Sequence, residues 1–414
     1  MQMKSFICLS AIAMATSFCG CSGNNSSANT ASAPAADTTT LPPVETKAPN
    51  ADYKPAFEGQ TRVKAVKTTT AYKVEKIAEN LGGPWAVAPM PDGRLLITIK
   101  SGYMEIRNAD GTLAKKITGF PKVEDAGQGG LLDVALDPDF AQNKTIYWSF
   151  SEKQGKGNLT SVAKGQLSAD ETTIQNPTVI FFFFFALDSK LHFVLCLIFD
   201  KDGNLFVSAG ERSILEGRKQ AQWLNAGLGK VFKITKEGKP APGNPFIGQK
   251  DAMPEIYAYG MRNPQSLDIN PVTGQLWEAE FGPRGGDEVN IIEAGKNYGW
   301  PIITYGIEYS GSKIGDSIQQ KEGLEQPVYY WDPVISPGGM VFYTGNGIPE
   351  WKNNLFIGGL SSMHIVRLVI ENNKVVGEER LLEDKKERFR DVAQSNDVLY
   401  AVTDGGSLYK ISKQ

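Results

Sequence analysis

A weak pattern recurs six times along the chain, and it constrains the fold more than any other feature. In each copy a turn of Asp, Asn, Gly or Pro leads into alternating apolar residues, which is typical of a β-strand leaving a turn. The copies lie at residues 91–97, 137–148, 202–207, 273–277, 351–357 and 397–402. Their spacing of roughly 45 to 80 residues suits a four-stranded blade with variable loops. The pattern predicts an all-β fold, a six-bladed β-propeller over residues 71–414; a β-sandwich with coincidental turns is the alternative.

Composition agrees with this expectation and excludes several kinds of function. Of the 414 residues, 43 are Gly and 10% are aromatic, and no long amphipathic helical stretch stands out, which favours an all-β chain. The 43 Lys and Arg nearly balance the 46 Asp and Glu, so we expect no nucleic-acid partner held by bulk charge. The two histidines, His192 and His364, are too few for a His-rich zinc site.

The first 20 residues have the character of a lipoprotein signal peptide. Lys4 precedes an apolar run that is too short to span a membrane and ends in small residues. The motif FCGC at 18–21 resembles a bacterial lipobox, so Cys21 is expected to carry a lipid anchor to the membrane; a plain signal peptide with incidental cysteines is the alternative. Within residues 71–414 the only cysteine is Cys196, so no disulfide is expected within the propeller.

Residues 21–70 form a second region of unusual composition. They are rich in Ser, Thr, Ala, Pro and Asn and have hardly an aliphatic core residue, which predicts a disordered tether. Signal peptide, lipidated Cys21 and tether together predict a protein of the bacterial cell envelope, a periplasmic or outer-membrane lipoprotein.

Loops from all blades of a propeller gather at one end of its central channel, so residues remote in sequence can meet there. The stretch from Tyr257 to Pro301 carries two loops dense in Gly, Pro, Asn and charge, at 262–264 and 281–288, on either side of one short strand. Each loop alone can be an ordinary surface turn. Their pairing marks this stretch as the expected rim of a functional site.

Several residues in such loops can carry chemistry. Gln128 stands between glycines that let other groups approach closely, and Arg262-Asn263 places a cation beside an amide. His192 precedes a predicted strand, and Glu211 follows the same hairpin. The ordinary pKa of imidazole suits proton transfer near neutral pH, although a structural histidine is the alternative.

Two charged clusters point to anionic and cationic ligands. Arg388 and Arg390 lie on one face of a predicted strand and suit a ligand with several carboxylates or phosphates. A solvated edge, with Glu387 and Asp391 as partners, is the alternative.

The Gly282-Pro283 segment exposes backbone carbonyl groups, and Asp287-Glu288 adds carboxylates. Hard oxygen ligands of this kind suit Ca²⁺, and a Gly- and Asp-rich turn without metal is the alternative.

The ordered series of motifs carries a family resemblance. It consists of GQGGLLDVALDPDF at 127–140, RNPQ at 262–265, FGPRGGDEVN at 281–290, GKNYGWP at 295–301, SPGGMVFYTG at 336–345, LFIGGL at 355–360 and ERFRDV at 387–392. From Leu81 to the C-terminus the chain resembles the soluble quinoprotein sugar dehydrogenases, the aldose sugar and glucose/sorbosone dehydrogenases. That family uses pyrroloquinoline quinone (PQQ) and calcium on a six-bladed propeller.

The resemblance implies that the chain oxidises an aldose to a lactone by hydride transfer to PQQ. His192 would be the general base that takes the proton of the sugar C1 hydroxyl, Glu211 would orient it, and Arg262 would stabilise developing charge. The implied cofactor-binding residues are Gln128, Arg262, Asn263, Tyr309, Gly359, Leu360, Ser361, Arg388 and Arg390.

The resemblance also implies metal ligands. The Gly282 and Pro283 carbonyl groups would hold the Ca²⁺ that polarises the quinone, and Glu288 and Tyr298 would match a further calcium site. The resemblance does not identify the physiological acceptor that takes the electrons from reduced PQQ.

The chain departs from the family pattern at Val194-Leu195-Cys196 and at Met261. These departures favour, as an alternative, a non-catalytic propeller that binds a sugar or a protein partner through a changed face. A calcium-dependent lactonase of the propeller class is a third interpretation, because that chemistry requires neither His192 nor the arginine pair.

Overall fold

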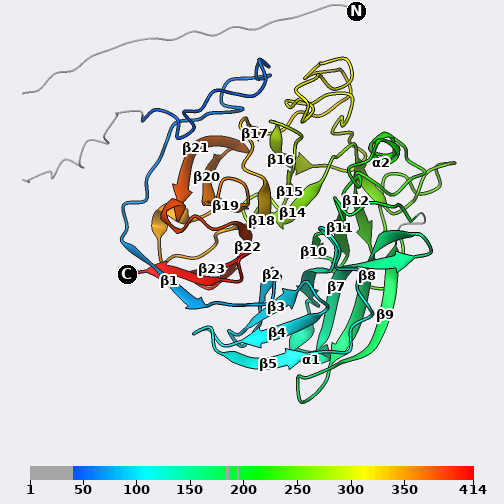
Figure 1. Ribbon diagram of the computed structural model, residues 1–414, viewed down its shortest axis with the longest axis vertical. Helices are drawn as coiled ribbons and strands as arrows, with labels where there is room; N and C mark the ends of the chain where they lie inside the picture. Colours follow the sequence, from blue (N-terminus) through cyan, green and yellow to red (C-terminus); the bar gives the residue numbers. More distant parts are fainter. Residues whose placement is uncertain (1–40, 183–185, 194) are drawn as a thin grey trace, which may run out of the picture. The chain divides into compact units, whose positions relative to one another are not determined.

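The computed structural model of the chain describes residues 41–182, 186–193 and 195–414. These residues form six antiparallel four-stranded sheets, the blades, arranged around a common centre (Figure 1). The alternating runs of the sequence therefore become blades, and the predicted six-bladed β-propeller is confirmed. The signal peptide, the cysteine proposed for lipidation and residues 21–40 of the predicted tether lie outside the described residues.

The strands run from the centre outward within each blade. Blade 1 has β2 (Pro84–Pro89), β3 (Leu95–Ile99), β4 (Tyr103–Arg107) and β5 (Leu113–Ile117); blade 2 has β6 (Leu131–Leu136), β7 (Thr145–Gln154), β8 (Gly157–Leu167) and β9 (Ile174–Phe182). Blade 3 has β10 (Leu197–Phe199), β11 (Leu205–Ala209), β12 (Lys230–Ile234) and β13 (Ile256–Tyr259); blade 4 has β14 (Pro264–Ile269), β15 (Leu276–Glu280), β16 (Asp287–Ile292) and β17 (Tyr329–Trp331). Blade 5 has β18 (Pro337–Phe342), β19 (Leu355–Gly359), β20 (Ile365–Glu371) and β21 (Lys374–Leu381); blade 6 has β22 (Phe389–Ser395), β23 (Val398–Thr403), β24 (Leu408–Lys413) and β1 (Tyr72–Ala78). Short helices α1 (Phe140–Asn143), α2 (Leu215–Gln220), η1 (Pro349–Trp351) and η2 (Glu383–Lys385) lie in the connections.

Blade 6 closes the ring with strands from both ends of the propeller. Its outermost strand β1 pairs antiparallel with β24, with Tyr72 opposite Lys413. The first strand of the domain is thus held by the last, which joins the two ends of the propeller within one blade.

Stacking of blades explains why the second strands are so apolar. All residues of β3, β11 and β19 are buried, because each blade is covered on both faces by its neighbours. Trp148, Trp277 and Trp351 fill three different inter-blade clusters and are fully buried.

Aspartates on the innermost strands of alternate blades tie each of those blades to the next. Each accepts a hydrogen bond from a main-chain N–H of the following innermost strand: Asp133 from Leu197 at 2.7 Å, Asp268 from Phe342 at 2.6 Å and Asp391 from Val87 at 2.8 Å. Burial raises the pKa of Asp133 and of Asp268 to about 6. These carboxyl groups are therefore structural parts of the central channel.

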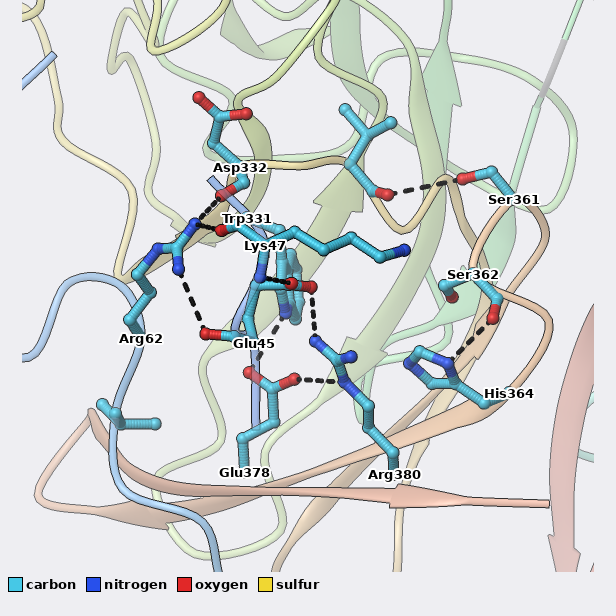
Figure 2. A network of polar contacts seen from close by, with 12 residues as sticks. Glu45, Lys47, Arg62, Trp331, Asp332, Ser361, Ser362, His364, Glu378 and Arg380 are labelled. Atoms are coloured by element: carbon cyan, nitrogen blue, oxygen red, sulfur yellow. Dashed lines mark hydrogen bonds and ion pairs between the residues drawn. The ribbon is translucent and has the colours of Figure 1, made fainter. Parts of the chain in front are cut away.

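Residues 41–70, here named the N-terminal strap, lie against blades 4 and 5 (Figures 1 and 2). Ala65 forms a parallel bridge with Glu378 of β21. Glu45 Oε2 lies 2.8 Å from Arg380 Nη2, and Arg62 donates to the carbonyl oxygens of Glu45 and Asp332 at 3.1 and 2.7 Å (Figure 2).

The sequence predicts a disordered tether over residues 21–70. The described part of this region, the strap of residues 41–70, is instead packed on the propeller. Its composition is poor in aliphatic residues, and the strap is held mostly by polar contacts. Gln60, for example, is fully buried and donates to the carbonyl oxygen of Pro327 at 2.9 Å. Composition reports only that apolar residues are few, and it carries no information on hydrogen-bond partners of this kind. Among the described residues, no helix has the length and apolar character needed to cross a bilayer.

Candidate active site

The predicted site residues come from two kinds of segment that meet at one face of the propeller. Neighbouring strands are antiparallel, so the start of each innermost strand and the end of each second strand lie at the same face. The segments that lead into the innermost strands, here named lead-in segments, or the first residues of those strands, carry Gln128, His192, Arg262, Asn263, Arg388 and Arg390. The ends of the second strands and the connections after them carry Glu211, Gly282, Pro283, Gly359, Leu360 and Ser361.

His192, in the lead-in segment of blade 3, is held through both its main chain and its ring. Its main-chain N–H donates to Gln128 Oε1 at 2.7 Å, and its Nδ1 lies 3.0 Å from Glu211 Oε1. The histidine is 5% exposed and the glutamate 1%. A carboxylate can only accept, so Nδ1 carries the hydrogen and Nε2 keeps the lone pair that can take a proton.

Burial and neighbouring charges act on this imidazole in different directions. Burial lowers the pKa of His192, the hydrogen bond to Glu211 raises it, and the charges of Arg262 and Arg212 lower it. The net pKa is lower than that of an ordinary histidine, so the ring is neutral at neutral pH. A neutral imidazole is the form that a general base requires.

Arg262 and Asn263 are fixed from the neighbouring strand of their own blade. Glu280, the last residue of β15, accepts the main-chain N–H of Arg262 at 2.6 Å and that of Asn263 at 3.0 Å through Oε2. The Arg262 Nη1 donates to the carbonyl oxygen of Gly282 at 2.6 Å. Burial raises the pKa of Glu280 to about 7.

Several buried polar atoms at this face have no hydrogen-bond partner among the described residues. They are Arg262 Nε, both side-chain polar atoms of Asn263, and Glu211 Oε2. Gly210 permits their close approach, since a Cβ there would lie 2.4 Å from Asn263 Oδ1 and 2.7 Å from the His192 carbonyl oxygen. Buried polar groups without partners are rare in proteins, and their gathering beside an imidazole fits a polar ligand.

The two predicted cofactor-binding arginines of blade 6 share one carboxylate. Arg388 Nε and Arg390 Nε each donate to Asp404, to different oxygens, at 2.8 Å. Both guanidinium groups thus reach the same side of the strand, as their alternation predicts. The partners differ from Glu387 and Asp391, the alternative partners considered from sequence, because those carboxylates bind elsewhere, Glu387 to Tyr409 Oη and Asp391 to the Val87 N–H.

A chain of contacts connects the His192 side of the face to the arginine pair. Asp287 accepts the main-chain N–H of Gly282 at 2.8 Å and that of Ser336 at 2.6 Å. The Leu360 N–H donates to the Ser336 carbonyl oxygen at 2.9 Å, and the Leu360 carbonyl oxygen accepts from Arg388 Nη1 at 3.2 Å. Blades 4, 5 and 6 therefore hold their site segments in one connected arrangement.

The residues expected to bind calcium lie in two surroundings. The Gly282 carbonyl oxygen accepts a hydrogen bond from the Arg262 guanidinium, so a cation bound to it would lie beside a positive charge. Glu288 lies with Glu278 around Asn290, whose Nδ2 donates to Glu278 Oε2 at 3.1 Å, and burial raises the pKa of both glutamates. Across the described residues, no group of three or more Asp, Glu, His or Cys side chains has the arrangement of a metal site. The Tyr298 hydroxyl donates to the Ile291 carbonyl oxygen at 2.5 Å.

Tyr309 lies in the long connection between β16 and β17, which returns to the site face. Ile307 of this connection bridges Arg284, next to Pro283, and Glu308 pairs with Arg218 of α2 at 2.5 Å. The Tyr309 side chain is 69% exposed, so it stands at the rim of the face and does not line its interior.

The two departures from the family pattern have structural positions of their own. Met261 is fully buried in an inter-blade cluster with Leu267 and Tyr298. Cys196 lines the central cavity of about 250 Å³ together with Arg390, while Val194 lies outside the described residues. Met261 thus belongs to the packing behind the site, whereas Cys196 reaches a cavity that a predicted cofactor-binding residue also lines.

Sequence reasoning missed three residues that hold the site: Arg212, Glu280 and Asp404. The number of residues between a lead-in residue and its acid could have identified Glu280 and Asp404. Glu211 follows His192 by 19 residues, and by the same strand geometry Glu280 follows Arg262 by 18 and Asp404 follows Arg390 by 14.

Solved structures define the class to which this fold belongs. The structure of the soluble aldose sugar dehydrogenase of Escherichia coli in its apo form superposes with a TM-score of 0.79 at 39% identity, covering 83% of this chain and all of that chain. The PQQ-bound form of an aldose sugar dehydrogenase from Streptomyces coelicolor superposes with a TM-score of 0.67 at 25% identity, covering 84% of this chain and 99% of the other. The class is that of propeller sugar dehydrogenases.

The chain belongs to the Glucose / Sorbosone dehydrogenase family, whose sequence model matches residues 81–410. Among its relatives, the aldose sugar dehydrogenase YliI of Escherichia coli K12 is 41% identical over 345 residues, 82% of this chain and 92% of the relative. The quinoprotein glucose dehydrogenase B of Acinetobacter calcoaceticus is 24% identical over 412 residues, 79% of this chain and 84% of the relative. The chain is accordingly a sugar dehydrogenase, an oxidoreductase.

Proposed function

We propose that the chain oxidises aldose sugars to lactones with PQQ as the bound cofactor that takes the hydride, calcium as metal and His192 as general base. In the reaction the C1–H bond breaks with its electron pair leaving as hydride, the C1 hydroxyl loses its proton, and the C1–O bond becomes the lactone carbonyl. PQQ, when bound, supplies the acceptor of the hydride. The His192–Glu211 pair is the observation that carries the proposal, since it offers a neutral imidazole with its free nitrogen fixed.

In this proposal each residue has a task in holding the substrate or the cofactor. His192 Nε2 accepts the hydroxyl proton, and Glu211 holds Nδ1 and stabilises the imidazolium that results. The unpaired atoms of Arg262 and Asn263, with Gln128, would bind the polar edge of the quinone. Arg262 brings positive charge to the place where negative charge develops.

The arginine pair would bind the carboxylates of PQQ. Asp404 holds Arg388 and Arg390 in place before any ligand binds, which lowers the entropy cost of binding. Gly359, Leu360, Ser361 and the rim residue Tyr309 would complete the pocket.

Calcium belongs to the same proposal. The Gly282 carbonyl group is a hard oxygen donor next to Arg262, the Pro283 carbonyl would be the second ligand there, and Glu288 and Tyr298 would serve the second proposed calcium site. Removal of calcium by a chelator should abolish dye reduction, and added Ca²⁺ should restore it. Full activity after exhaustive chelation would contradict the role of calcium.

Reconstitution tests the reaction. Purified protein is mixed with PQQ and Ca²⁺, PQQ binding is followed by its absorbance, and dye reduction is followed with several aldoses. His192→Ala should retain PQQ binding and lose turnover. PQQ binding without turnover in the unchanged protein would support the non-catalytic propeller instead, and lactone hydrolysis in quinone-free protein would support the lactonase.

We also propose an envelope location with a lipid anchor at Cys21. In cells grown with labelled palmitate, the protein should carry label and fractionate with membranes. Cys21→Ser should lose both properties, and an unlabelled unchanged protein would refute the anchor.

A further inference from the structure

Arg212 is a buried cation whose contacts serve the segment that carries His192. It is 3% exposed, and it follows Glu211 directly in the connection between β11 and β12. Its four side-chain hydrogen bonds in the described structure go to uncharged oxygens: the carbonyl oxygens of Ser189, Leu191 and Asn158 at 2.6, 3.1 and 3.2 Å, and Asn158 Oδ1. A buried guanidinium is costly unless its donors are used, so this set of contacts is a built arrangement.

These contacts fix the main chain on both sides of the histidine. Arg212 binds the carbonyl groups of Ser189 and Leu191, while the carbonyl of Lys190 between them accepts the Gln128 N–H at 2.8 Å. On the other side of His192, the guanidinium carbon of Arg212 lies 3.9 Å from the centre of the Phe193 ring.

The histidine itself needs such support. His192 has a φ of +50°, a conformation that costs energy for a residue with a side chain. Arg212 also carries a positive φ, +68°, and its carbonyl oxygen accepts from Ser189 Oγ at 2.5 Å. The two strained turns are thus tied to each other.

The guanidinium also adds a fixed charge near the imidazole, since Arg212 and His192 both line one small cavity of about 10 Å³. Among the described residues, the charged groups that act most on His192 are the Glu211 carboxylate, Arg262 and Arg212. Burial lowers the pKa of Arg212 to about 10, so it remains a cation at neutral pH.

We propose that Arg212 is a positioning residue for the sugar oxidation: it holds the main chain of residues 189–193 and keeps a positive charge beside His192, which favours the neutral imidazole. The proposal rests on the proposed role of His192 as base. Arg212 itself touches neither substrate nor cofactor in this proposal.

The two histidines of the chain make the charge effect directly measurable. In tag-free protein with ¹³C-labelled histidine, His192 and His364 give two imidazole signals, and His364→Gln assigns them. The titration midpoint of His192 is then measured without PQQ, so the result does not depend on the quinone reaction. Arg212→Met should raise this midpoint by roughly half a pH unit or more, because a nearby cation is lost.

Two variants separate charge from other effects. Arg212→Lys keeps the cation and should leave the His192 midpoint within about 0.2 pH unit of the unchanged protein. Arg218→Met, in α2 of the same connection, removes an arginine that is paired with Glu308 and should leave it unchanged as well. Equal shifts in Arg212→Met and Arg212→Lys would show that solvent access, and not charge, is responsible, and would overturn the proposal.

Activity tests the positioning part. Both Arg212 variants should lose at least about tenfold in kcat with a smaller change in KM, because neither lysine nor methionine can bind both carbonyl groups in the same fork. Only Arg212→Met should move the acid limb of the pH profile to higher pH. If Arg212→Met does not fold, Arg212→Lys decides: wild-type kcat in that variant would refute the positioning role. An inactive unchanged protein whose His192 midpoint still shifts in Arg212→Met would refute the dehydrogenase proposal and leave the charge effect standing.

Discussion

Glu211→Gln is the substitution that probes the proposed base most directly. Glu211 is 1% exposed and its Oε1 lies 3.0 Å from His192 Nδ1, so the change acts on a buried charge-assisted hydrogen bond. Such bonds contribute about 1.5 to 3 kcal/mol, which is roughly a tenfold to hundredfold effect on a rate. Glutamine adds a second effect, because its NH₂ group can donate to Nδ1 and so place the ring hydrogen on Nε2, the atom proposed to accept the proton.

The two effects together predict a fall in kcat of about 10² to 10⁴ in Glu211→Gln, with PQQ binding retained. Because Glu211 raises the pKa of His192, its loss should also move the acid limb of the kcat/KM profile to lower pH, opposite to Arg212→Met. The assay is steady-state dye reduction across pH with PQQ, Ca²⁺ and a saturating aldose. Glu211→Asp, which keeps the charge on a shorter side chain, should retain more activity than Glu211→Gln. A kcat for Glu211→Gln within about threefold of the unchanged protein would refute the assignment of the orienting role.

Three further predictions concern the cofactor, the ring and the strap. Arg390→Gln should weaken PQQ binding about tenfold or more in a fluorescence titration, because one charge-assisted contact to a carboxylate is lost; an unchanged Kd would contradict the pocket. Asp133→Asn should lower the free energy of unfolding in urea by about 1 to 3 kcal/mol, since one of two buried N–H partners is left without an acceptor. The folded pKa of Asp133, about 6, lies above its ordinary value, so the protonated carboxyl adds stability below about pH 4 that is lost as the pH rises through 6. The loss in the free energy of unfolding caused by Asp133→Asn should therefore become smaller between pH 4 and 7. A loss that stays constant over this range would contradict this linkage. Arg62→Ala should speed proteolytic cleavage within residues 41–70 but not within the blades, and equal cleavage rates in both proteins would show that the Arg62 contacts do not hold the strap.

The parts of the structure that follow from local pattern could be predicted from the sequence. Alternation of apolar residues and turn chemistry are local, and they predict six blades and place His192 and Arg262 in loops before innermost strands. Partners set by packing between distant segments could not be predicted. Arg212 is an ordinary basic residue in sequence, and only the fold brings it to the carbonyl groups of Ser189 and Leu191.

The strap shows the same limit of prediction from local sequence, here for a segment predicted to be disordered. Its composition predicts disorder, because the argument counts apolar residues that can be buried. The described part is held by groups such as Glu45 and Arg62, whose partners Arg380 and Asp332 lie more than 250 residues away in the chain. No local pattern can reveal contacts at that distance, so composition alone misjudged the segment.

The site itself follows one construction rule that repeats from blade to blade. In blades 3, 4 and 6, a carboxylate at or just beyond the end of the second strand holds a nitrogen-bearing residue. That residue lies in the lead-in segment or at the start of the innermost strand. The pairs are Glu211 with His192, Glu280 with the main chain of Arg262, and Asp404 with Arg390. Antiparallel pairing brings these two positions together in every blade, so an acid 14 to 19 residues downstream is the geometric partner. The lead-in segments can then present groups to a ligand, while the second strands fix the orientation of those groups. This division predicts that substitutions of Glu280 or Asp404 change the affinity for PQQ through the residues they hold, and that the effect of Asp404→Asn disappears in a protein that already carries Arg388→Gln and Arg390→Gln. A full effect of Asp404→Asn in that triple variant would show that Asp404 acts in some other way.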